Sequence, residues 1–117
     1  MSNEHNNSPL ADILVVDDDP ESLRLLPQVL GQAGFKVRPA RDGQQALSAA
    51  RLAPPDLILL DLIMPGMTGY EVCEALKADE ATSAIPVIFI SGLNQALDKV
   101  RAFAAGGVDY ISKPFQD

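Results

Sequence analysis

The stretch ILVVDDDPESL, residues 13–23, joins four aliphatic residues directly to three aspartates and then to an amphipathic segment. The aliphatic run is typical of a buried β-strand, and from Leu23 to Leu30 apolar residues recur at helical spacing. Asp19 followed by Pro20 is a typical helix start, because aspartate caps a helix and proline fits its first position. The stretch therefore predicts a strand, a short connection and a helix.

The same order of strand and helix is repeated along the chain. Strands are expected at residues 11–16, 36–40, 56–63, 85–91 and 108–112, and helices at residues 20–34, 43–52, 69–79 and 94–106. Such alternation indicates parallel strands joined by crossover helices that cover the sheet. Pro39 marks the second strand as an edge strand, because proline cannot donate a hydrogen bond to a neighbour. The sequence predicts an α/β fold with a doubly wound sheet of five parallel strands.

The composition indicates a single acidic domain. The 117 residues are 47% hydrophobic, which is enough for one core and too little for two ordinary domains. Nine lysines and arginines against sixteen aspartates and glutamates give a net charge of -7, which opposes binding to nucleic acid or to an anionic membrane. No apolar stretch is long enough for a membrane span, and the single cysteine excludes an intrachain disulfide. We expect a cytoplasmic domain at residues 12–117 that follows a flexible tail at residues 1–11.

Polar side chains stand at the ends of four predicted strands. They are Asp17 and Asp18 after the first strand, Asp61 at the third, Ser91 at the fourth and Lys113 after the fifth. Sites in open parallel sheets form outside the carboxyl ends of the strands, so these side chains are expected to meet in one crevice. One helix start needs one cap, and Asp19 supplies it. Asp17 and Asp18 therefore point to a binding site.

Three carboxylates in one crevice require a cation, because adjacent negative charges repel one another. Oxygen ligands from a few acids, completed by water and a phosphate group, match the coordination of Mg²⁺. A calcium-binding EF-hand loop does not fit: counted from Asp17, its sixth position is Ser22 rather than glycine and its twelfth is Gln28 rather than glutamate. The acids therefore predict a magnesium site.

Beside such a cation, Asp61 can act as a nucleophile towards a phosphoryl group and form an aspartyl phosphate. Lys113 and the hydroxyl of Ser91 would then take up charge on the phosphoryl oxygens. The turn MPGMTG, residues 64–69, is expected to leave the Asp61 carboxylate exposed, and Gly66 and Gly69 are expected to serve that turn.

The stretches ILVVDDDP, LILLDLIMPGMTGYEV, VIFISG and GGVDYISKPF together resemble the receiver domain of two-component response regulators. The resemblance implies a flavodoxin-like sheet with the strand order 2-1-3-4-5. It also implies that Asp61 accepts a phosphoryl group from a histidine kinase or a histidine phosphotransfer protein. Asp18 and Asp61 would bind Mg²⁺ directly, Asp17 would act through water, and the main-chain carbonyl of Ile63 would complete the protein's ligands. Ser91 would bond to the phosphoryl group and Lys113 would pair with it.

Two further features follow from the resemblance. Tyr110 matches an aromatic residue that changes rotamer when the Ser91 hydroxyl moves, and Lys113-Pro114 matches a peptide bond that is cis in the family. The chain stops where the family begins a fifth helix, so that helix is expected to be truncated or absent. An output domain or self-association would then cover the bare face of the sheet.

Two other functions are compatible with parts of this pattern. A phosphatase of the haloacid dehalogenase type also uses an aspartyl nucleophile, but it needs an acid two residues later, where this chain has Ile63. A degenerate receiver that only binds a partner protein has usually lost an acid or the lysine, and Lys113 and the acids are present here. We therefore expect a phosphoacceptor that catalyses only its own phosphorylation and dephosphorylation, with the degenerate receiver as the alternative.

Overall fold

Five parallel strands form one sheet in the computed structural model, which describes residues 9–91 and 98–112 of the chain. The strands are β1 (Asp12–Val16), β2 (Lys36–Ala40), β3 (Leu57–Asp61), β4 (Val87–Ser91) and β5 (Asp109–Ser112). The helices are α1 (Pro20–Gln32), α2 (Gly43–Leu52), α3 (Gly69–Ala78) and α4 (Lys99–Ala104). The predicted alternation of strands and helices is confirmed.

The strands lie in the order β2-β1-β3-β4-β5, and every neighbouring pair is parallel. This is the flavodoxin-like order that the sequence predicted. Pro39 lies in β2 at one edge of the sheet, where a missing donor is tolerated. In the register of β3 with β4, Asp61 pairs with Ile90. Asp61 and Ser91 are therefore the last residues of neighbouring strands and lie together at the carboxyl ends of the strands.

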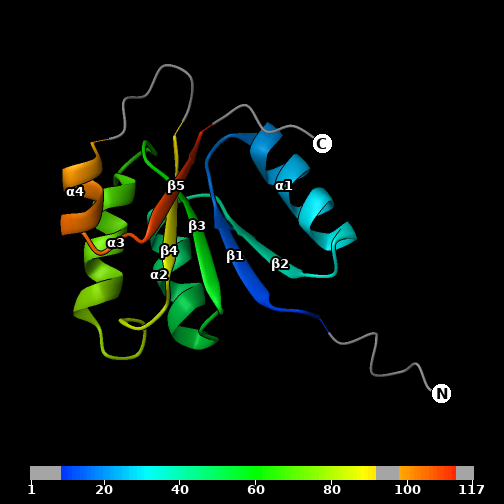
Figure 1. Ribbon diagram of the computed structural model, residues 1–117, viewed down its shortest axis with the longest axis horizontal. Coiled ribbons are helices and arrows are strands. Elements are labelled where there is room, and N and C mark those ends of the chain that lie inside the picture. The colour runs from blue at the N-terminus through cyan, green and yellow to red at the C-terminus, as the bar shows by residue number, and fades with distance from the viewer. Residues whose placement is uncertain (1–8, 92–97, 113–117) are drawn as a thin grey trace.

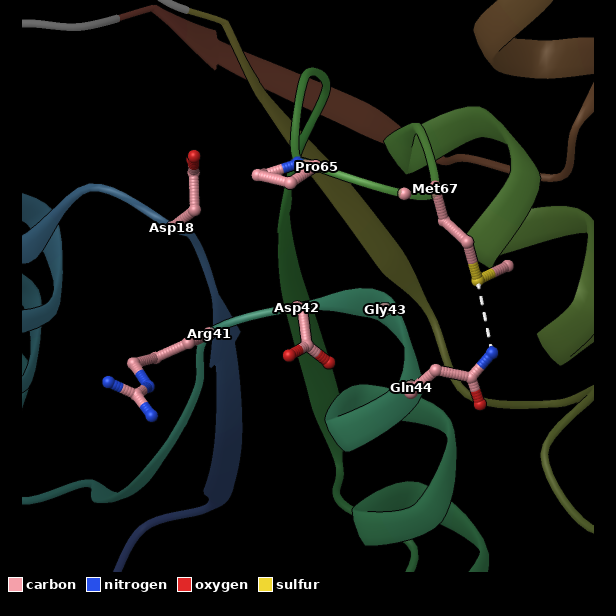
Figure 2. A pocket seen from close by; sticks show the side chains of 8 residues that line it. Asp18, Arg41, Asp42, Gly43, Gln44, Pro65 and Met67 are labelled. Carbon is pink, nitrogen blue, oxygen red and sulfur yellow. Dashed lines mark hydrogen bonds between the residues drawn. The ribbon is translucent and has the colours of Figure 1, made fainter.

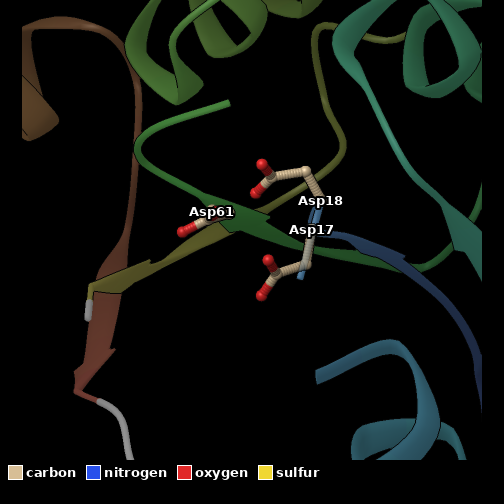
Figure 3. A group of neighbouring side chains, drawn as sticks. All are labelled: Asp17, Asp18 and Asp61. Atoms are coloured by element: carbon tan, nitrogen blue, oxygen red, sulfur yellow. The ribbon is translucent and has the colours of Figure 1, made fainter. Parts of the chain in front are cut away.

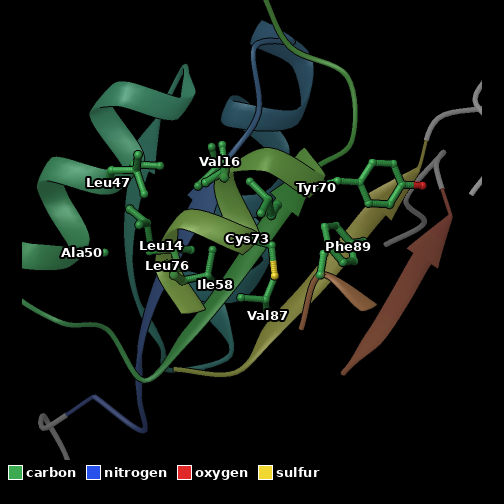
Figure 4. Close-up of a cluster of buried hydrophobic side chains, with 14 of the residues drawn as sticks. Leu14, Val16, Leu47, Ala50, Ile58, Tyr70, Cys73, Leu76, Val87 and Phe89 are labelled. Atoms are coloured by element: carbon green, nitrogen blue, oxygen red, sulfur yellow. The ribbon is translucent and has the colours of Figure 1, made fainter. Parts of the chain in front are cut away.

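The helices cover the two faces of the sheet unequally. Figure 1 shows α1 alone on one side, while α2, α3 and α4 lie on the other. The larger core lies under these three helices; its buried members include Leu14, Ile58, Leu76 and Phe89 (Figure 4). A smaller core under α1 contains Ile13, Val15, Leu26, Leu59 and Ile90. Alternate residues of β1 and β3 therefore enter opposite cores, as expected for strands buried on both faces.

Side-chain caps set the beginnings of the helices. The carboxylate of Asp19 accepts a hydrogen bond from the N–H of Glu21 at 3.1 Å, and α1 continues unbroken through Pro27. Thr68 and Glu71 form a reciprocal capping box at α3. These caps fix where each helix leaves the edge of the sheet that carries the polar residues.

Several boundaries differ from the predicted ones by one or two residues. The fourth helix, α4, begins at Lys99, and the side chain of Asp98 caps it by accepting the N–H of Arg101 at 3.1 Å; the predicted start at Asn94 lies outside the described residues. The third strand ends at Asp61 rather than at Ile63. It ends there because Leu62 turns away and its carbonyl accepts the N–H of Gly69 at 2.7 Å.

Residues 113–117, where the sequence raised the question of a fifth helix, lie outside the described residues. Within the described residues, every helix is too short or too polar to span a bilayer.

Candidate functional site

Three carboxylates gather where β1 and β3 end. Asp17 and Asp18 directly follow β1, and Asp61 is the last residue of β3. Each of the three offers a carboxylate oxygen, and these oxygens all lie within 4.8 Å of one another. Figure 3 shows the three side chains projecting in the same general direction from the two strand ends. The structure therefore brings together the three acids that the sequence predicted as neighbours.

The three acids differ in burial. Asp17 and Asp61 are buried, at 0% and 1% exposed, whereas Asp18 is exposed. One carboxylate oxygen of Asp17 accepts the N–H of Asp19 at 2.9 Å, so Asp17 also shapes the connection into α1. The predicted exposure of the Asp61 carboxylate was wrong. Asp61 is buried, and the start of α3 packs directly on its backbone.

Glycines make that packing possible. Gly66 has a φ of 87°, a backbone conformation that favours glycine, and it reverses the chain after β3. Gly69 begins α3 beside the carbonyl of Asp61, where a Cβ atom would meet the carbonyl oxygen at 2.2 Å. The prediction that both glycines are needed for the turn after Asp61 is confirmed.

The charge of the cluster defines its chemistry. Two carboxylates at about 4 Å repel each other by roughly 4 kcal/mol at an effective dielectric constant of 20. Hard divalent cations prefer oxygen ligands of this kind, and Mg²⁺ is bound through one or two carboxylates together with water and phosphate oxygens. The donor set of this cluster fits such an ion.

Three other predicted site residues, Ser91, Tyr110 and Ile63, are among the described residues. Ser91 is the last residue of β4 and is 5% exposed. Tyr110 in β5 pairs with Phe89 and is 36% exposed. Ile63 lies in the loop after β3, with its side chain 57% exposed. Lys113 and Pro114 lie outside the described residues.

A pocket of about 520 Å³ adjoins the acid cluster. Its walls are Asp18, residues 41–44 at the start of α2, and residues 65–67 of the loop after β3 (Figure 2). The side-chain amide of Gln44 donates to the sulfur of Met67 at 3.8 Å, which joins two of these walls. The sequence did not predict this pocket. One feature of the sequence could have indicated the pocket. The loop that follows the second strand leaves the sheet on the same side as the acids, and it carries Arg41.

The sequence model of the response regulator receiver domain family matches residues 13–117. The chain belongs to this family. Receiver domains bind Mg²⁺ at an acidic pocket, and the described part of this chain has an acidic cluster at Asp17, Asp18 and Asp61.

Curated relatives are similar along most of the chain. The DNA-binding response regulator MtrA of Mycolicibacterium smegmatis is 44% identical over 104 residues, which are 89% of this chain and 44% of that protein. The response regulator PleD of Caulobacter vibrioides is 43% identical over 107 residues, or 92% of this chain and 24% of that protein. The chain thus spans less than half the length of these relatives.

Solved receiver structures share the fold. The N-terminal domain of a response regulator receiver protein from Methanoculleus marisnigri JR1 superposes with a TM-score of 0.81 at 37% identity, covering 90% of this chain and 85% of that one. The chemotaxis protein CheY4 of Vibrio cholerae gives a TM-score of 0.84 at 31% identity, with 91% and 88% covered.

Proposed function

We propose that this receiver domain accepts a phosphoryl group on Asp61 from a phosphohistidine donor, in a reaction that requires Mg²⁺. The observation that carries the proposal is the meeting of three carboxylate oxygens within 4.8 Å at the ends of β1 and β3. The donor would be a histidine kinase or a histidine phosphotransfer protein, in keeping with the receiver family.

Asp17, Asp18, Asp61 and the main-chain carbonyl of Ile63 would hold the cation. When bound, Mg²⁺ would neutralise the cluster and the phosphoryl oxygens, so that an anionic nucleophile can approach an anionic phosphoryl group. Asp18, as the exposed member, would meet the cation at the mouth of the site, while Asp17 would act from the buried side.

In the transfer itself, a carboxylate oxygen of Asp61 would attack phosphorus. The new O–P bond forms as the P–N bond to the donor histidine breaks, and the electron pair of that bond returns to the imidazole. The Ser91 hydroxyl would donate a hydrogen bond to a phosphoryl oxygen, and the Lys113 ammonium would pair with another. The chain would catalyse only its own phosphorylation and the later hydrolysis by water.

Phosphorylation would then change a surface for protein contacts. The phosphoryl group adds about -1.5 to -2 units of charge. This charge would draw the Ser91 hydroxyl inward, and Tyr110 would turn into the space that it leaves. Tyr110 in the edge strand β5 pairs with Phe89 in β4 and is partly exposed. Its movement would therefore alter the surface near α4.

The partners of this surface would be an output domain or a second copy of the chain. MtrA, described as a DNA-binding response regulator, extends well beyond the matched region. We propose that any nucleic-acid contact of a parent protein lies outside this segment, because the segment carries a net charge of -7.

Labelling with acetyl phosphate tests the proposal. Incubation with acetyl phosphate and Mg²⁺ should add one phosphoryl group to the intact chain, as read by mass spectrometry. Asp61→Asn should remain unlabelled, and omission of Mg²⁺ should abolish labelling of the wild type. Full labelling of Asp61→Asn would refute the assignment. A wild type that takes no label but binds a partner would favour the degenerate receiver.

A further inference from the structure

Tyr70, the second residue of α3, joins that helix to two other elements. Its ring lies 5.4 Å from the ring of Phe89 in β4, measured between centroids (Figure 4). Its hydroxyl oxygen accepts the N–H of Asp98, the N-cap of α4, at 3.1 Å. The guanidinium carbon of Arg101 in α4 stands 4.3 Å from the centroid of the same ring. Tyr70 is only 7% exposed, so these contacts form largely away from water.

The residue before Tyr70, Gly69, packs on the backbone of Asp61. The N–H of Gly69 donates to the carbonyl of Leu62 at 2.7 Å, which closes the loop after Asp61 at its base. There is no space for a Cβ atom between Gly69 and the carbonyl of Asp61. The first turn of α3 therefore touches Asp61 with one residue and the beginning of α4 with the next.

We propose that Tyr70 couples the acid cluster to α4. A cation bound by Asp61 and by the following loop would shift that loop. The hydrogen bond from the Gly69 N–H to the Leu62 carbonyl closes the loop, so its shift would also move Gly69. Packed interiors have low compressibility, so a shift of Gly69 is passed to Tyr70 rather than absorbed. The ring of Tyr70 then shifts against Phe89 and Arg101, and the hydrogen bond that its hydroxyl accepts from the Asp98 N–H is altered. This path is separate from the one proposed above through Ser91 and Tyr110, and its use as a signal rests on the proposed function.

The coupling has a measurable consequence in the amide hydrogen exchange of α4. Local opening of a short helix exposes its amides, and each contact that holds the helix lowers the population of the open form. A coupling free energy between two sites commonly corresponds to a factor of about 5 to 150. Mg²⁺ alone, without a phosphodonor, should therefore change the exchange rates of residues 99–105 in the wild-type chain by at least about 5-fold.

Tyr70→Phe tests the link because it keeps the ring against Phe89 and removes only the hydroxyl. One lost hydrogen bond should speed exchange in α4 by about 2- to 10-fold without metal. The response of α4 to Mg²⁺ should fall to less than half that of the wild type. Arg101→Gln, which removes the cation from the ring, should weaken the response in the same direction. Val100→Ala is the matched control on the same helix, since Val100 is 79% exposed, and it should keep the wild-type response.

The outcomes separate this inference from the proposed function. An unchanged Mg²⁺ response in Tyr70→Phe would overturn the coupling, even if acetyl phosphate labels Asp61 normally. A wild type whose α4 shows no response to Mg²⁺ would overturn it as well. A chain in which α4 responds through Tyr70 but Asp61 takes no label would support the coupling and contradict the phosphoacceptor role.

Discussion

Gly69 lies so close to Asp61 that a Cβ atom on the glycine would stand 2.2 Å from the aspartate's carbonyl oxygen. Real Cβ atoms do not approach backbone oxygen atoms this closely, and neither backbone can yield by rotating a side chain. The beginning of α3 and the end of β3 are thus fitted to each other at the residue proposed to carry the phosphoryl group. Glycine at position 69 is a steric requirement of the site.

Gly69→Ala should therefore destabilise the domain. Forcing one extra carbon into a packed site costs about 1–3 kcal/mol, and the close backbone contact places this site at the upper end or beyond. Urea unfolding followed by circular dichroism measures the change. Gly31→Ala is a matched control in α1, where a Cβ atom would meet nothing within 4 Å. This control should gain about 0.5–1 kcal/mol, because alanine favours a helix over glycine. Equal stability of both variants would contradict the steric interpretation.

Substitution of Asp17 and substitution of Asp18 should have different effects on Mg²⁺ affinity and on stability. Asp18→Ala removes a proposed direct ligand and should weaken Mg²⁺ binding by more than 100-fold, whereas a residue that acts through another ligand costs about 10- to 100-fold. Without metal, Asp17→Ala loses the acceptor for the Asp19 N–H, which costs about 1–3 kcal/mol. It also removes a buried charge that repels its neighbours by roughly 4 kcal/mol, so the metal-free variant should be at least as stable as the wild type. Calorimetric titration with Mg²⁺ and unfolding in the absence of metal measure the two quantities. Equal losses of affinity would refute the distinction between direct and water-mediated roles.

The side chain at position 63 should control how long the aspartyl phosphate survives. Hydrolysis requires a water molecule lined up opposite Asp61, and the exposed apolar side chain of Ile63 cannot hold one. Ile63→Asn should speed decay by at least about 5-fold, because an amide can position the water. The variant is labelled, freed of excess donor and followed by mass spectrometry. Val108→Asn is the control, since Val108 is similarly exposed, at 55%, near the far end of β5. Unchanged or slower decay in Ile63→Asn would contradict this role.

The parallel sheet and the acid cluster could be predicted because both follow from local patterns. Alternation of aliphatic strands and amphipathic helices restricts the chain to a parallel sheet, and residues after parallel strands must meet at one edge. Asp17, Asp18 and Asp61 were found in this way, with the resemblance to receiver domains supplying the strand order.

The burial of Asp61 could not be predicted in the same way, because burial depends on tertiary packing that no local pattern contains. The close contact of Gly69 with the Asp61 backbone is of the same kind. The contacts of Tyr70 also join residues distant in sequence, and no spacing rule reveals them.

The thiol of Cys73 should resist modification and make the domain less stable at high pH. Burial in the core under α3 raises its pKa to about 11, since the thiolate would lose its hydration there. A group whose pKa is raised by folding stabilises the fold fully below the pKa of the unfolded chain and loses that contribution as the pH rises. The free energy of unfolding should therefore fall by about 1.4 kcal/mol per pH unit between roughly pH 9 and pH 11 through this group alone.

Cys73→Ala isolates that contribution, because it removes the thiol and leaves every other titratable side chain in place. The difference in unfolding free energy between wild type and variant should be constant below pH 8 and should shrink above about pH 9. A thiol reagent at pH 8 should modify the folded wild type far more slowly than the urea-unfolded chain, because the reactive thiolate is both scarce and enclosed. Modification of folded and unfolded chains at equal rates would show that the core under α3 opens readily. A pH-independent difference between wild type and Cys73→Ala would show that burial does not hold the proton on the thiol.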